Sequence, residues 1–523
     1  MAYTDSRNKF NMINSEYSDE AVYKRSGDFV SNLLELIEKS EFRDAFVFHG
    51  VSLWDAIAPL LAAFILPEGV LIYAKKGKWV YWGEYLFLRK VKVLVKKIIS
   101  TGQRKEKEVA NIQRETLDNT QKLGIFLNFT SKHFIETFSR VSGLLKESNL
   151  RFKVIGSYEE NIPKGDFLPI PELSNDDIRL INDQISRFQN QFKKINESRI
   201  LDQLKNKFPI EYKVFQDNFG ALSRSVFPVI AASISRGDSV ISSLRPRIII
   251  GGDDCDYRAR VYFLLAKMKT VPTLLLQQGL ASYKTVDFMF LSTDKIAVIG
   301  EDSYIKLLKM GVPAEKMIIT GRPGFDSLVI PGPVDQQGMK DYLLFTSQPY
   351  VAGAFKDRQS RRKILEQIYS LSVSGFPIII KPHPGEKLDI HRKLSAKFNK
   401  AILADKNCDT NKLIKDCGVF ITCSSTTALQ AMIAGKPVII FNYEKCSEHS
   451  PYYGSEAVSI ASTYEELTKV IKYTLENKNK ILSQSNKERE DFIKFNTYLP
   501  DGNASGRILG IINEMLRSKE LKS

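Results

Sequence analysis

Short apolar runs recur through the second half of the chain, and each is followed by a stretch of helical periodicity. The runs show no alternation of apolar and polar positions, which is typical of parallel strands covered on both faces. Strands that alternate with helices predict a doubly wound α/β sheet. We expect strands at 247–250, 272–276, 296–299, 317–320, 342–345, 378–381, 419–422 and 438–441.

A run of turn formers at 331–338 divides this pattern in two, because its prolines and glycines interrupt both periodicities. We therefore predict one Rossmann-like domain over 1–330 and a second one over 331–490. The segment 491–523 is predicted to be a helical tail that packs back on the N-terminal domain.

The N-terminal domain is predicted to begin with an amphipathic helix at 27–40 and a strand at 44–49. A glycine turn and an apolar helix follow that strand, which is how a Rossmann-like unit opens. Residues about 100–240 are polar and repeat apolar positions at helical spacing. We interpret them as an α-helical insertion in the N-terminal domain.

Two of the predicted strands, 378–381 and 419–422, each end in a polar loop, and the second loop opens directly into a helix. In open α/β sheets, ligands bind outside the carboxyl ends of the strands. A helix start with free amides and hydroxyls favours an anion. The sequence therefore predicts a phosphate site, for the phosphate or diphosphate of an activated sugar, at Lys381, His383, Ser424, Ser425 and Thr426.

Each of these residues also has a purely structural interpretation. His383 lies between two prolines, which fix its direction but can serve turn geometry alone. Ser424 and Ser425 can act as ordinary helix N-caps. Glu444, just past the strand at 438–441, can hold a ribose hydroxyl as acidic residues do in related folds, or can be a surface charge.

Transfer of a sugar to a hydroxyl also needs a general base. Asp253 and Asp254 follow the predicted strand at 247–250, and neighbouring carboxylates can raise the pKa of one of them. We take these two as the first choice for the base and Asp55 as the second, with His49 as a further candidate site residue. The alternatives are a solvated acidic turn in which Asp256 caps the next helix, and a capping role for Asp55.

The acidic cluster can also bind Mg²⁺, but no carboxylate pair of the DxD type lies beside the predicted phosphate site. We therefore expect a metal-independent reaction and no cofactor. Five cysteines without a CxxC spacing indicate neither a disulfide framework nor a zinc site, and they suit a reducing compartment. They are Cys255, Cys408, Cys417, Cys423 and Cys446.

With 43% hydrophobic and 26% charged residues, the chain of 523 residues is neither disordered nor fibrous. Its polar N-terminus carries no apolar signal-peptide core, and its longest apolar stretch, 56–66, is too short to cross a membrane. We therefore expect a cytoplasmic protein.

The net charge of +15 is concentrated in one segment. Residues 75–107 carry eleven Lys or Arg and two Glu, and so contribute nine of the fifteen excess charges. Aromatic residues lie among them, which suits a helix on the anionic inner face of a membrane. A solvated basic helix with inward aromatics is the plainer alternative. Nucleic-acid binding is not expected, because no recognition pattern accompanies the charge.

Five short stretches resemble motifs of one enzyme group, the surface-polysaccharide branch of the GT-B glycosyltransferases. That branch includes capsule Kdo transferases, polysialyltransferases and CDP-glycerol glycerophosphotransferases. The His-Pro and paired-serine motifs of its CMP- or CDP-dependent members resemble Lys381-Pro-His-Pro384 and Ser424-Ser425. The "QHG", "TGxPxxD" and "DGxAsxR" stretches of the wider superfamily are similar to Leu276-Gln-Gln-Gly279, Ile319-Thr-Gly-Arg-Pro-Gly-Phe-Asp326 and Asp501-Gly-Asn-Ala-Ser-Gly-Arg507.

The resemblance implies two Rossmann-like domains that face a cleft, with the acceptor on the N-terminal side and the nucleotide donor on the C-terminal side. It implies an inverting transfer from a CMP-, CDP- or UDP-activated sugar to a growing or lipid-linked polysaccharide. Gln278, where a His is usual, and Gly279 would contact the donor. The alternatives are a CDP-polyol phosphotransferase of the teichoic-acid type and a UDP-sugar 2-epimerase.

Overall fold

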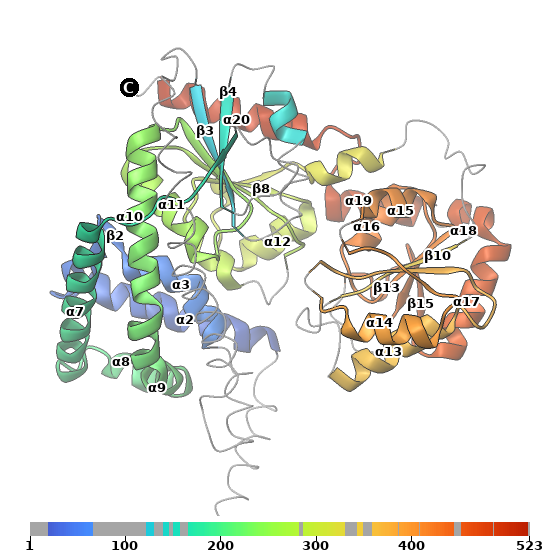
Figure 1. Ribbon diagram of the computed structural model, residues 1–523, viewed down its shortest axis with the longest axis horizontal. Helices are drawn as coiled ribbons and strands as arrows, with labels where there is room; N and C mark the ends of the chain where they lie inside the picture. Colours follow the sequence, from blue (N-terminus) through green and yellow to red (C-terminus); the bar gives the residue numbers. More distant parts are fainter. Residues whose placement is uncertain are drawn as a thin grey trace, which may run out of the picture. The chain divides into compact units, whose positions relative to one another are not determined.

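The computed structural model describes residues 19–65, 122–129, 140–145, 150–156, 166–281, 286–329, 342–348, 358–384, 386–406, 408–443, 451–484 and 486–520. The chain forms two compact units (Figure 1). The first unit comprises Met1–Val298, Ser303–Ile319 and Gly506–Ser523, and the second comprises Ile299–Asp302 and Thr320–Ser505. The predicted membrane segment 75–107, the turn-rich segment 331–338 and Glu444 lie outside the described residues.

The first unit is built on a parallel sheet of seven strands in the order β5-β4-β3-β6-β7-β8-β9. The chain starts at β3, moves outward to β5, and then returns to the other side of β3. The direction of winding therefore reverses between β3 and β6. The strands are β3 Lys122–Asn128, β4 Leu150–Gly156, β5 Phe167–Leu168, β6 Ile248–Gly251, β7 Thr273–Leu276, β8 Lys295–Val298 and β9 Met317–Ile319.

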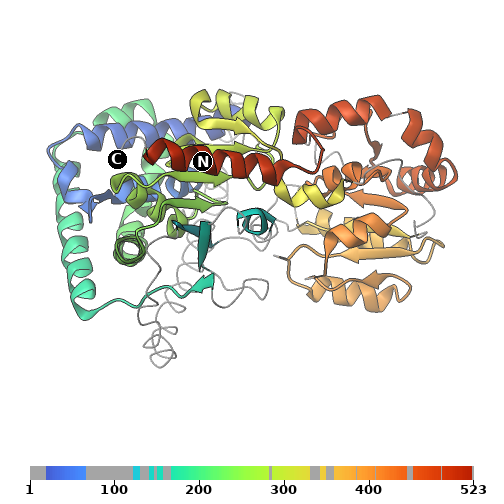
Figure 2. The same ribbon diagram turned by 90° about the horizontal axis from the view of Figure 1, so that it is seen from above.

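Both faces of this sheet are covered, which explains why its strands are apolar without alternation. In β6, Ile249 packs into one core with helices α3 (Leu53–Phe64), α10 (Phe227–Leu244) and α11 (Tyr257–Met268). Its neighbours in the strand pack into a second core on the opposite face, with α20 (Ala504–Glu520). Figure 2 shows α20 lying along that face.

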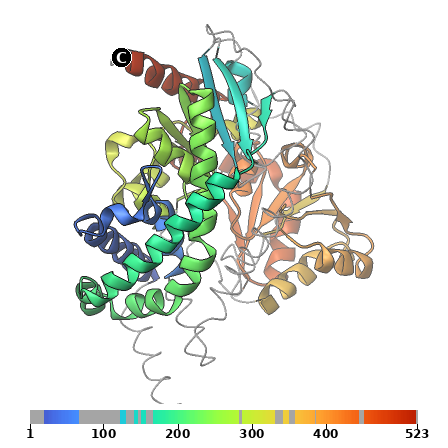
Figure 3. The ribbon, with the colours of Figure 1, turned by 60° about the vertical axis from the view of Figure 1, so that its left-hand side comes forward.

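The helical content predicted for residues 100–240 is present, but the range also contains three strands of the sheet. The helices are α7 Asn175–Glu197, α8 Asp202–Lys207, α9 Pro209–Ser225 and α10. Figure 3 shows α7 and α10 side by side. The strands β3, β4 and β5 lie before α7, and β3 is central in the sheet. Its apolar core is short and is flanked by polar sequence, so helical periodicity dominated the pattern. This core consists of Leu123, Ile125, Phe126 and Leu127.

The predicted opening strand at 44–49 is wrong. Residues Arg43–Phe46 form a 3-10 helix, and β1 (Val47–Phe48) pairs antiparallel with β2 (Val51–Ser52) in a separate hairpin. His49 and Gly50 form its two-residue loop with φ angles of 44° and 76°, the left-handed geometry that such hairpins favour. The loop after residue 48 therefore does not follow a strand of the parallel sheet. The first helix, α2, is also longer than predicted and spans Asp19–Glu38.

The helices near the N-terminus pack around one aromatic cluster in the first unit. Trp54 is 1% exposed, and its ring centroid lies 5.6–6.1 Å from those of Phe46, Phe188, Phe192, Phe215, Phe219 and Phe227. These rings come from the 3-10 helix Arg43–Phe46 and from α7, α9 and α10, so the cluster joins helices far apart in the sequence.

The second unit contains a parallel sheet of six strands in the order β12-β11-β10-β13-β14-β15. The strands are β10 Leu343–Thr346, β11 Ile378–Lys381, β12 Ile402–Leu403, β13 Val419–Thr422, β14 Val438–Phe441 and β15 Ser459–Ala461. Its winding reverses between β10 and β13, as that of the first sheet does between β3 and β6. The prediction of two doubly wound, Rossmann-like units is confirmed by these two strand orders.

The start of helix α20 is capped by a carboxylate from another part of the second unit. Asp326 accepts hydrogen bonds from the Ala504 amide (3.0 Å), the Ser505 amide (2.9 Å) and the Ser505 hydroxyl (2.6 Å). The "TGxPxxD"-like and "DGxAsxR"-like stretches therefore meet at the start of this helix. An acidic group there satisfies amides without helical partners and interacts favourably with the helix dipole.

We expect Asp326→Ala to lower the free energy of unfolding by about 1–2 kcal/mol, the usual cost of losing an N-terminal cap. Urea unfolding followed by circular dichroism measures this loss. Asp491→Ala is the control, because Asp491 is exposed on α19 (Asn486–Thr497). Equal unfolding midpoints for the two variants would show that the Asp326 contacts contribute nothing.

Gly300 allows a close approach of two backbone segments in the second unit. A Cβ atom at this position would lie 2.4 Å from the carbonyl carbon and oxygen of Asn496. Gly300→Ala is therefore expected to destabilise the protein by about 1–3 kcal/mol, as overpacking does. Gly510→Ala, where a Cβ meets nothing within 4 Å, should be neutral or slightly stabilising in its helix. Thermal unfolding of the two variants checks the contrast.

Candidate functional site

The carboxyl ends of three neighbouring strands meet in the second sheet. β10 lies between β11 and β13, with Thr346 opposite Lys381 and Phe345 opposite Ile421. The residues that follow these strands therefore lie at one edge. We call this edge the second rim, because it belongs to the second sheet. It is formed by Ser347, Gln348, His383, Ser424 and Ser425.

Gln348 and Ser424 contact each other across the point where the winding reverses. The Ser424 amide donates to Gln348 Oε1 at 2.8 Å, and Gln348 Nε2 donates to the Ser424 hydroxyl at 3.2 Å. Gln348 is 8% exposed, so its amide group is fixed by these contacts. The sequence analysis missed Gln348. Its position two residues after a buried strand was the available signal.

Ser425 has the structural role that the sequence analysis gave as its alternative. Its hydroxyl oxygen accepts from the Thr427 amide at 3.3 Å and from the Thr427 hydroxyl at 2.8 Å, at the start of α16 (Thr427–Ile433). Thr426 precedes the helix, but its side chain makes no capping hydrogen bond. The Ser424 hydroxyl contacts Gln348 in the loop after β10, and the Thr427 hydroxyl lies 2.8 Å from that of Thr346 in β10.

His383 is half-buried, and its backbone amide donates to Glu386 Oε2 at 2.7 Å. Burial lowers the pKa of the His383 imidazole, an effect that the negative charge of Glu386 partly offsets. The ring is therefore neutral at neutral pH, and a neutral imidazole can donate one N–H to an oxygen.

Lys381 is oriented differently from the prediction. Its side chain is buried, and Nζ donates to the carbonyl oxygens of Pro382 (3.0 Å) and Lys406 (2.8 Å). These bonds bind the ammonium group to the adjoining loops. We therefore assign Lys381 to holding the loop after β11, and we leave direct phosphate contact to the residues of the second rim.

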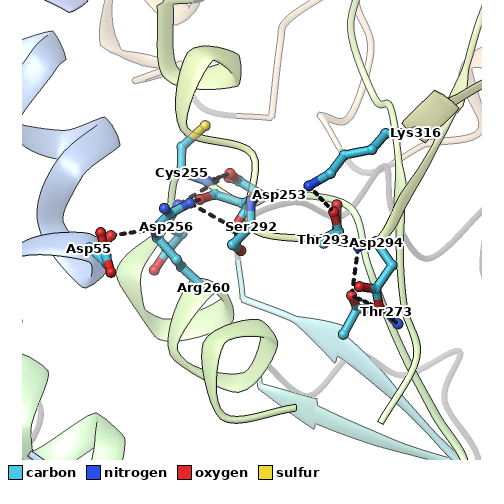
Figure 4. Close-up of polar contacts among 11 residues, drawn as sticks. Asp55, Asp253, Cys255, Asp256, Arg260, Thr273, Ser292, Thr293, Asp294 and Lys316 are labelled. Carbon is cyan, nitrogen blue, oxygen red and sulfur yellow. Dashed lines mark hydrogen bonds and ion pairs between the residues drawn. The ribbon is translucent and has the colours of Figure 1, made fainter. Parts of the chain in front are cut away.

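The first sheet has its own acidic loop where the winding reverses (Figure 4). Asp253 follows β6 and is half-buried. Its Oδ1 accepts from the amides of Cys255 (2.7 Å) and Asp256 (3.2 Å), and the Cys255 side chain also donates a hydrogen bond to this carboxylate. Burial raises the pKa of Asp253, and the negative charge of Asp256 adds to this, although the two amides act in the opposite direction.

Asp254 is held on both oxygens. It is 5% exposed and accepts from the Ser292 amide and hydroxyl, both at 2.6 Å, and from Arg260 Nη1 at 3.1 Å. Arg260 Nε also donates to the Asp55 carbonyl oxygen at 2.6 Å, so this ion pair joins the loop after β6 to α3. A carboxylate with these partners serves as an anchor, which leaves Asp253 as the accessible member of the pair.

The acidic loop also contains a helix cap. Asp256 accepts from the Arg258 amide at 2.9 Å at the start of α11. The capping role that the sequence analysis gave as an alternative therefore holds for Asp256.

Asp55 and His49 lie in the segment that the structure separates from the parallel sheet. The Asp55 side chain is exposed, and its amide donates to the Ser52 hydroxyl at 3.2 Å in the first turn of α3. It lines a hollow of about 400 Å³ together with Glu38 and Arg43. His49 Nδ1 lies 3.1 Å from Asp238 Oδ2, a contact that ties the hairpin to α10. Neither residue follows a strand of the parallel sheet, although the Asp55 carbonyl oxygen accepts from Arg260, the partner of Asp254.

Gln278 and Gly279 follow β7, the strand next to β6. Gln278 Nε2 donates to the Leu276 carbonyl at 3.0 Å, and its buried Oε1 has no hydrogen-bond partner among the described residues. Gly279 is exposed, and a Cβ there would meet nothing within 4 Å. Both are at the same edge as Asp253, since all three follow neighbouring parallel strands.

The described residues contain no group of three or more His, Cys, Asp or Glu placed to hold a metal ion. In the same residues, no helix combines the length and the apolar character that a membrane crossing requires.

No protein-family model and no curated protein sequence matches this chain. Solved structures do. The UDP-GlcNAc 2-epimerase from Methanocaldococcus jannaschii is 14% identical, with a TM-score of 0.45, and the match covers 75% of this chain and 100% of that one. For the UDP-N-acetylglucosamine 2-epimerase from Rickettsia bellii the identity is 14%, the TM-score 0.45 and the coverage 76% and 97%.

A third match is MurG from Acinetobacter baumannii, with 13% identity, a TM-score of 0.41 and coverage of 75% and 99%.

Proposed function

We propose that the protein is a GT-B-type glycosyltransferase that moves a sugar from a nucleotide-activated donor, with CMP or CDP favoured over UDP, to a growing or lipid-linked cell-surface polysaccharide. The observation that carries this proposal is the second rim. There, Gln348, His383 and Ser424 follow three adjacent parallel strands at the reversal of the winding. Ligands of open α/β sheets bind at this position.

The second rim offers hydrogen-bond donors to the phosphate that leaves with the nucleotide. Negative charge builds on this group as the bond to the sugar breaks, and fixed donors aimed at it lower the barrier. The neutral imidazole of His383 supplies one N–H, and the hydroxyl of Ser424 can supply a second. The backbone amides of both residues are bonded to neighbouring side chains before the donor arrives, and Gln348 Nε2 also donates to the Ser424 hydroxyl.

The acceptor hydroxyl must lose a proton, and Asp253 is the residue that we assign to take it. A carboxylate whose pKa is raised by burial is a stronger base than an exposed one. Gln278 and Gly279, which follow the next strand, are proposed to contact the substrates from the same sheet. In this proposal the first unit binds the acceptor, the second binds the donor, and no metal takes part.

The basic segment 75–107 is proposed to hold the enzyme at the anionic inner face of the cell membrane, where a lipid-linked acceptor is found. Glu444 remains the proposed partner of the ribose hydroxyls. Sedimentation with vesicles that contain phosphatidylserine, compared with neutral vesicles, tests the membrane contact through its dependence on salt.

A thermal-shift screen with CMP, CDP, UDP and GDP tests the donor site, because a ligand that binds the folded state raises its melting temperature. We expect at least one nucleotide to stabilise the protein, and we expect His383→Ala and the double variant Ser424→Ala/Ser425→Ala to lose most of that shift. Variants that bind every nucleotide as tightly as the parent would place the donor elsewhere.

Analysis of the product separates this proposal from its two alternatives. A transferred sugar without phosphorus in the new linkage supports the glycosyltransferase. Phosphorus in the linkage would instead identify a polyol-phosphate transferase, and conversion of a UDP-sugar without any acceptor would identify a 2-epimerase.

A further inference from the structure

Glu386 is a buried carboxylate three residues after His383, and its side chain is 1% exposed. Oε2 accepts from the His383 amide at 2.7 Å, and Oε1 accepts from the Ser347 hydroxyl at 2.9 Å. Arg361 also donates to Oε1, and the buried His391 places Nε2 3.6 Å from the same oxygen. One carboxylate therefore contacts the loops after β10 and β11 and side chains from two helices.

Arg361 connects these contacts to Gln348 and, through the Gln348 side chain, to Ser424 after β13. It lies on α13 (Arg358–Ser370), is 15% exposed, and its Nε donates to the Gln348 carbonyl at 3.4 Å. The side chain of Gln348 in turn holds Ser424. A continuous path of hydrogen bonds therefore connects His383, at the end of β11, with Ser424, at the end of β13.

The pair is unsuited to contact a donor phosphate itself. Burial would raise the pKa of Glu386, but hydrogen bonds from its neighbours outweigh burial and lower it to about 2, so the group is ionised at neutral pH. A carboxylate repels a phosphate, and both Glu386 oxygens are already occupied by donors. The Arg361 guanidinium is already paired with this carboxylate.

We propose that Glu386 and Arg361 are a positioning pair that fixes His383 and Ser424 in the orientation needed to bind the donor phosphate. This inference rests on the proposed function, since it assigns the pair a task at the same rim. The competing interpretation is that the pair only stabilises the second unit. The two differ in what they predict for the phosphate part of a ligand.

Glu386→Gln in the full-length protein is the first test, because the amide keeps the shape of the side chain and removes its charge. Calorimetry should show about tenfold weaker binding of CDP or UDP, the loss typical when one member of a connected network is changed. Binding of the matching nucleoside, cytidine or uridine, should stay within twofold of the parent, since the base and ribose do not touch this path.

Imidazole NMR gives a readout that does not depend on a ligand. The negative charge of Glu386 raises the pKa of His383, so Glu386→Gln should lower the pH at which the His383 signals titrate. Arg362→Gln is the matched control. Arg362 lies on the same helix and pairs with Glu366 at 3.2 Å, but its side chain is 69% exposed. This variant should change neither nucleotide binding nor the titration.

If Glu386→Gln fails to fold, Arg361→Lys tests the positioning role instead. Lysine keeps the charge opposite Glu386 but loses the fork that reaches Gln348, so CDP binding should weaken in the same direction and by a smaller factor. Folded variants that bind CDP as the parent does, or that lose CDP and cytidine by equal factors, overturn the inference. A parent protein that binds no nucleotide overturns the proposed function itself, and this result is read before any variant is made.

Discussion

Asp253→Asn is expected to lower the turnover number by about 10²–10⁴-fold, the contribution that a positioned general base usually makes. The amide cannot accept the proton of the acceptor hydroxyl. It can still accept the amide hydrogen bonds of Cys255 and Asp256, so the loop should keep its form. Donor binding should be unchanged, and steady-state kinetics with nucleotide release as the signal measure the effect.

The pH profile gives the same prediction an independent check. Asp253 acts as a base only when ionised, and burial places its pKa above the usual range for Asp. The rate should therefore rise with pH through an ionisation above that range and level off once the group is charged. A parent enzyme whose rate is constant across this region would argue against Asp253 as the base.

Asp254→Ala is the contrasting variant. It leaves the buried Arg260 without its carboxylate, so we expect a loss of about 3–5 kcal/mol in the free energy of unfolding. The two neighbouring aspartates should therefore differ in what their variants change. Asp253→Asn should slow the chemical step, and Asp254→Ala should lower stability. Reversed results would exchange the two roles.

His383→Ala is expected to lower kcat/KM by about 10²–10³-fold, the usual effect of removing one donor to a developing negative charge. The imidazole N–H is lost, whereas the backbone amide that bonds to Glu386 remains. His383→Gln keeps a side-chain N–H and should recover part of the rate. A variant that keeps the parent rate would remove His383 from the site.

His49→Ala serves as the control for this prediction. His49 contacts Asp238 in the hairpin region, away from the strands of the parallel sheet, and its loss should leave kcat/KM within about twofold of the parent.

Strands with a purely apolar core were predictable from the sequence. The bounds of β11, β13 and β14 agree with the prediction, because each is a run of aliphatic residues closed by Gly, Pro or a polar loop. By contrast, β3 and β4 carry few apolar residues between polar stretches. Long-range pairing with β6 defines β3 as a strand, and pairing with β3 defines β4.

Residues that directly follow a strand could be placed at a sheet edge from the sequence. His383, Ser424 and Asp253 belong to that class, and so does Gln348, which follows β10 at the same distance but was not predicted. The contacts of Gln348 and Glu386 could not be predicted, because they depend on the order of strands in the sheet: Gln348 reaches Ser424 across 76 positions of sequence. The direction of the Lys381 side chain was likewise set by the carbonyl of Lys406, which sequence spacing does not reveal.

The most direct test of the account follows the His383 imidazole by NMR while CDP, CMP or UDP is added to the full-length protein. The account predicts that the His383 signals shift on binding and saturate with the nucleotide, whereas those of His49 stay in place. Binding that leaves the His383 signals unchanged would contradict the claim that the donor phosphate lies at the second rim.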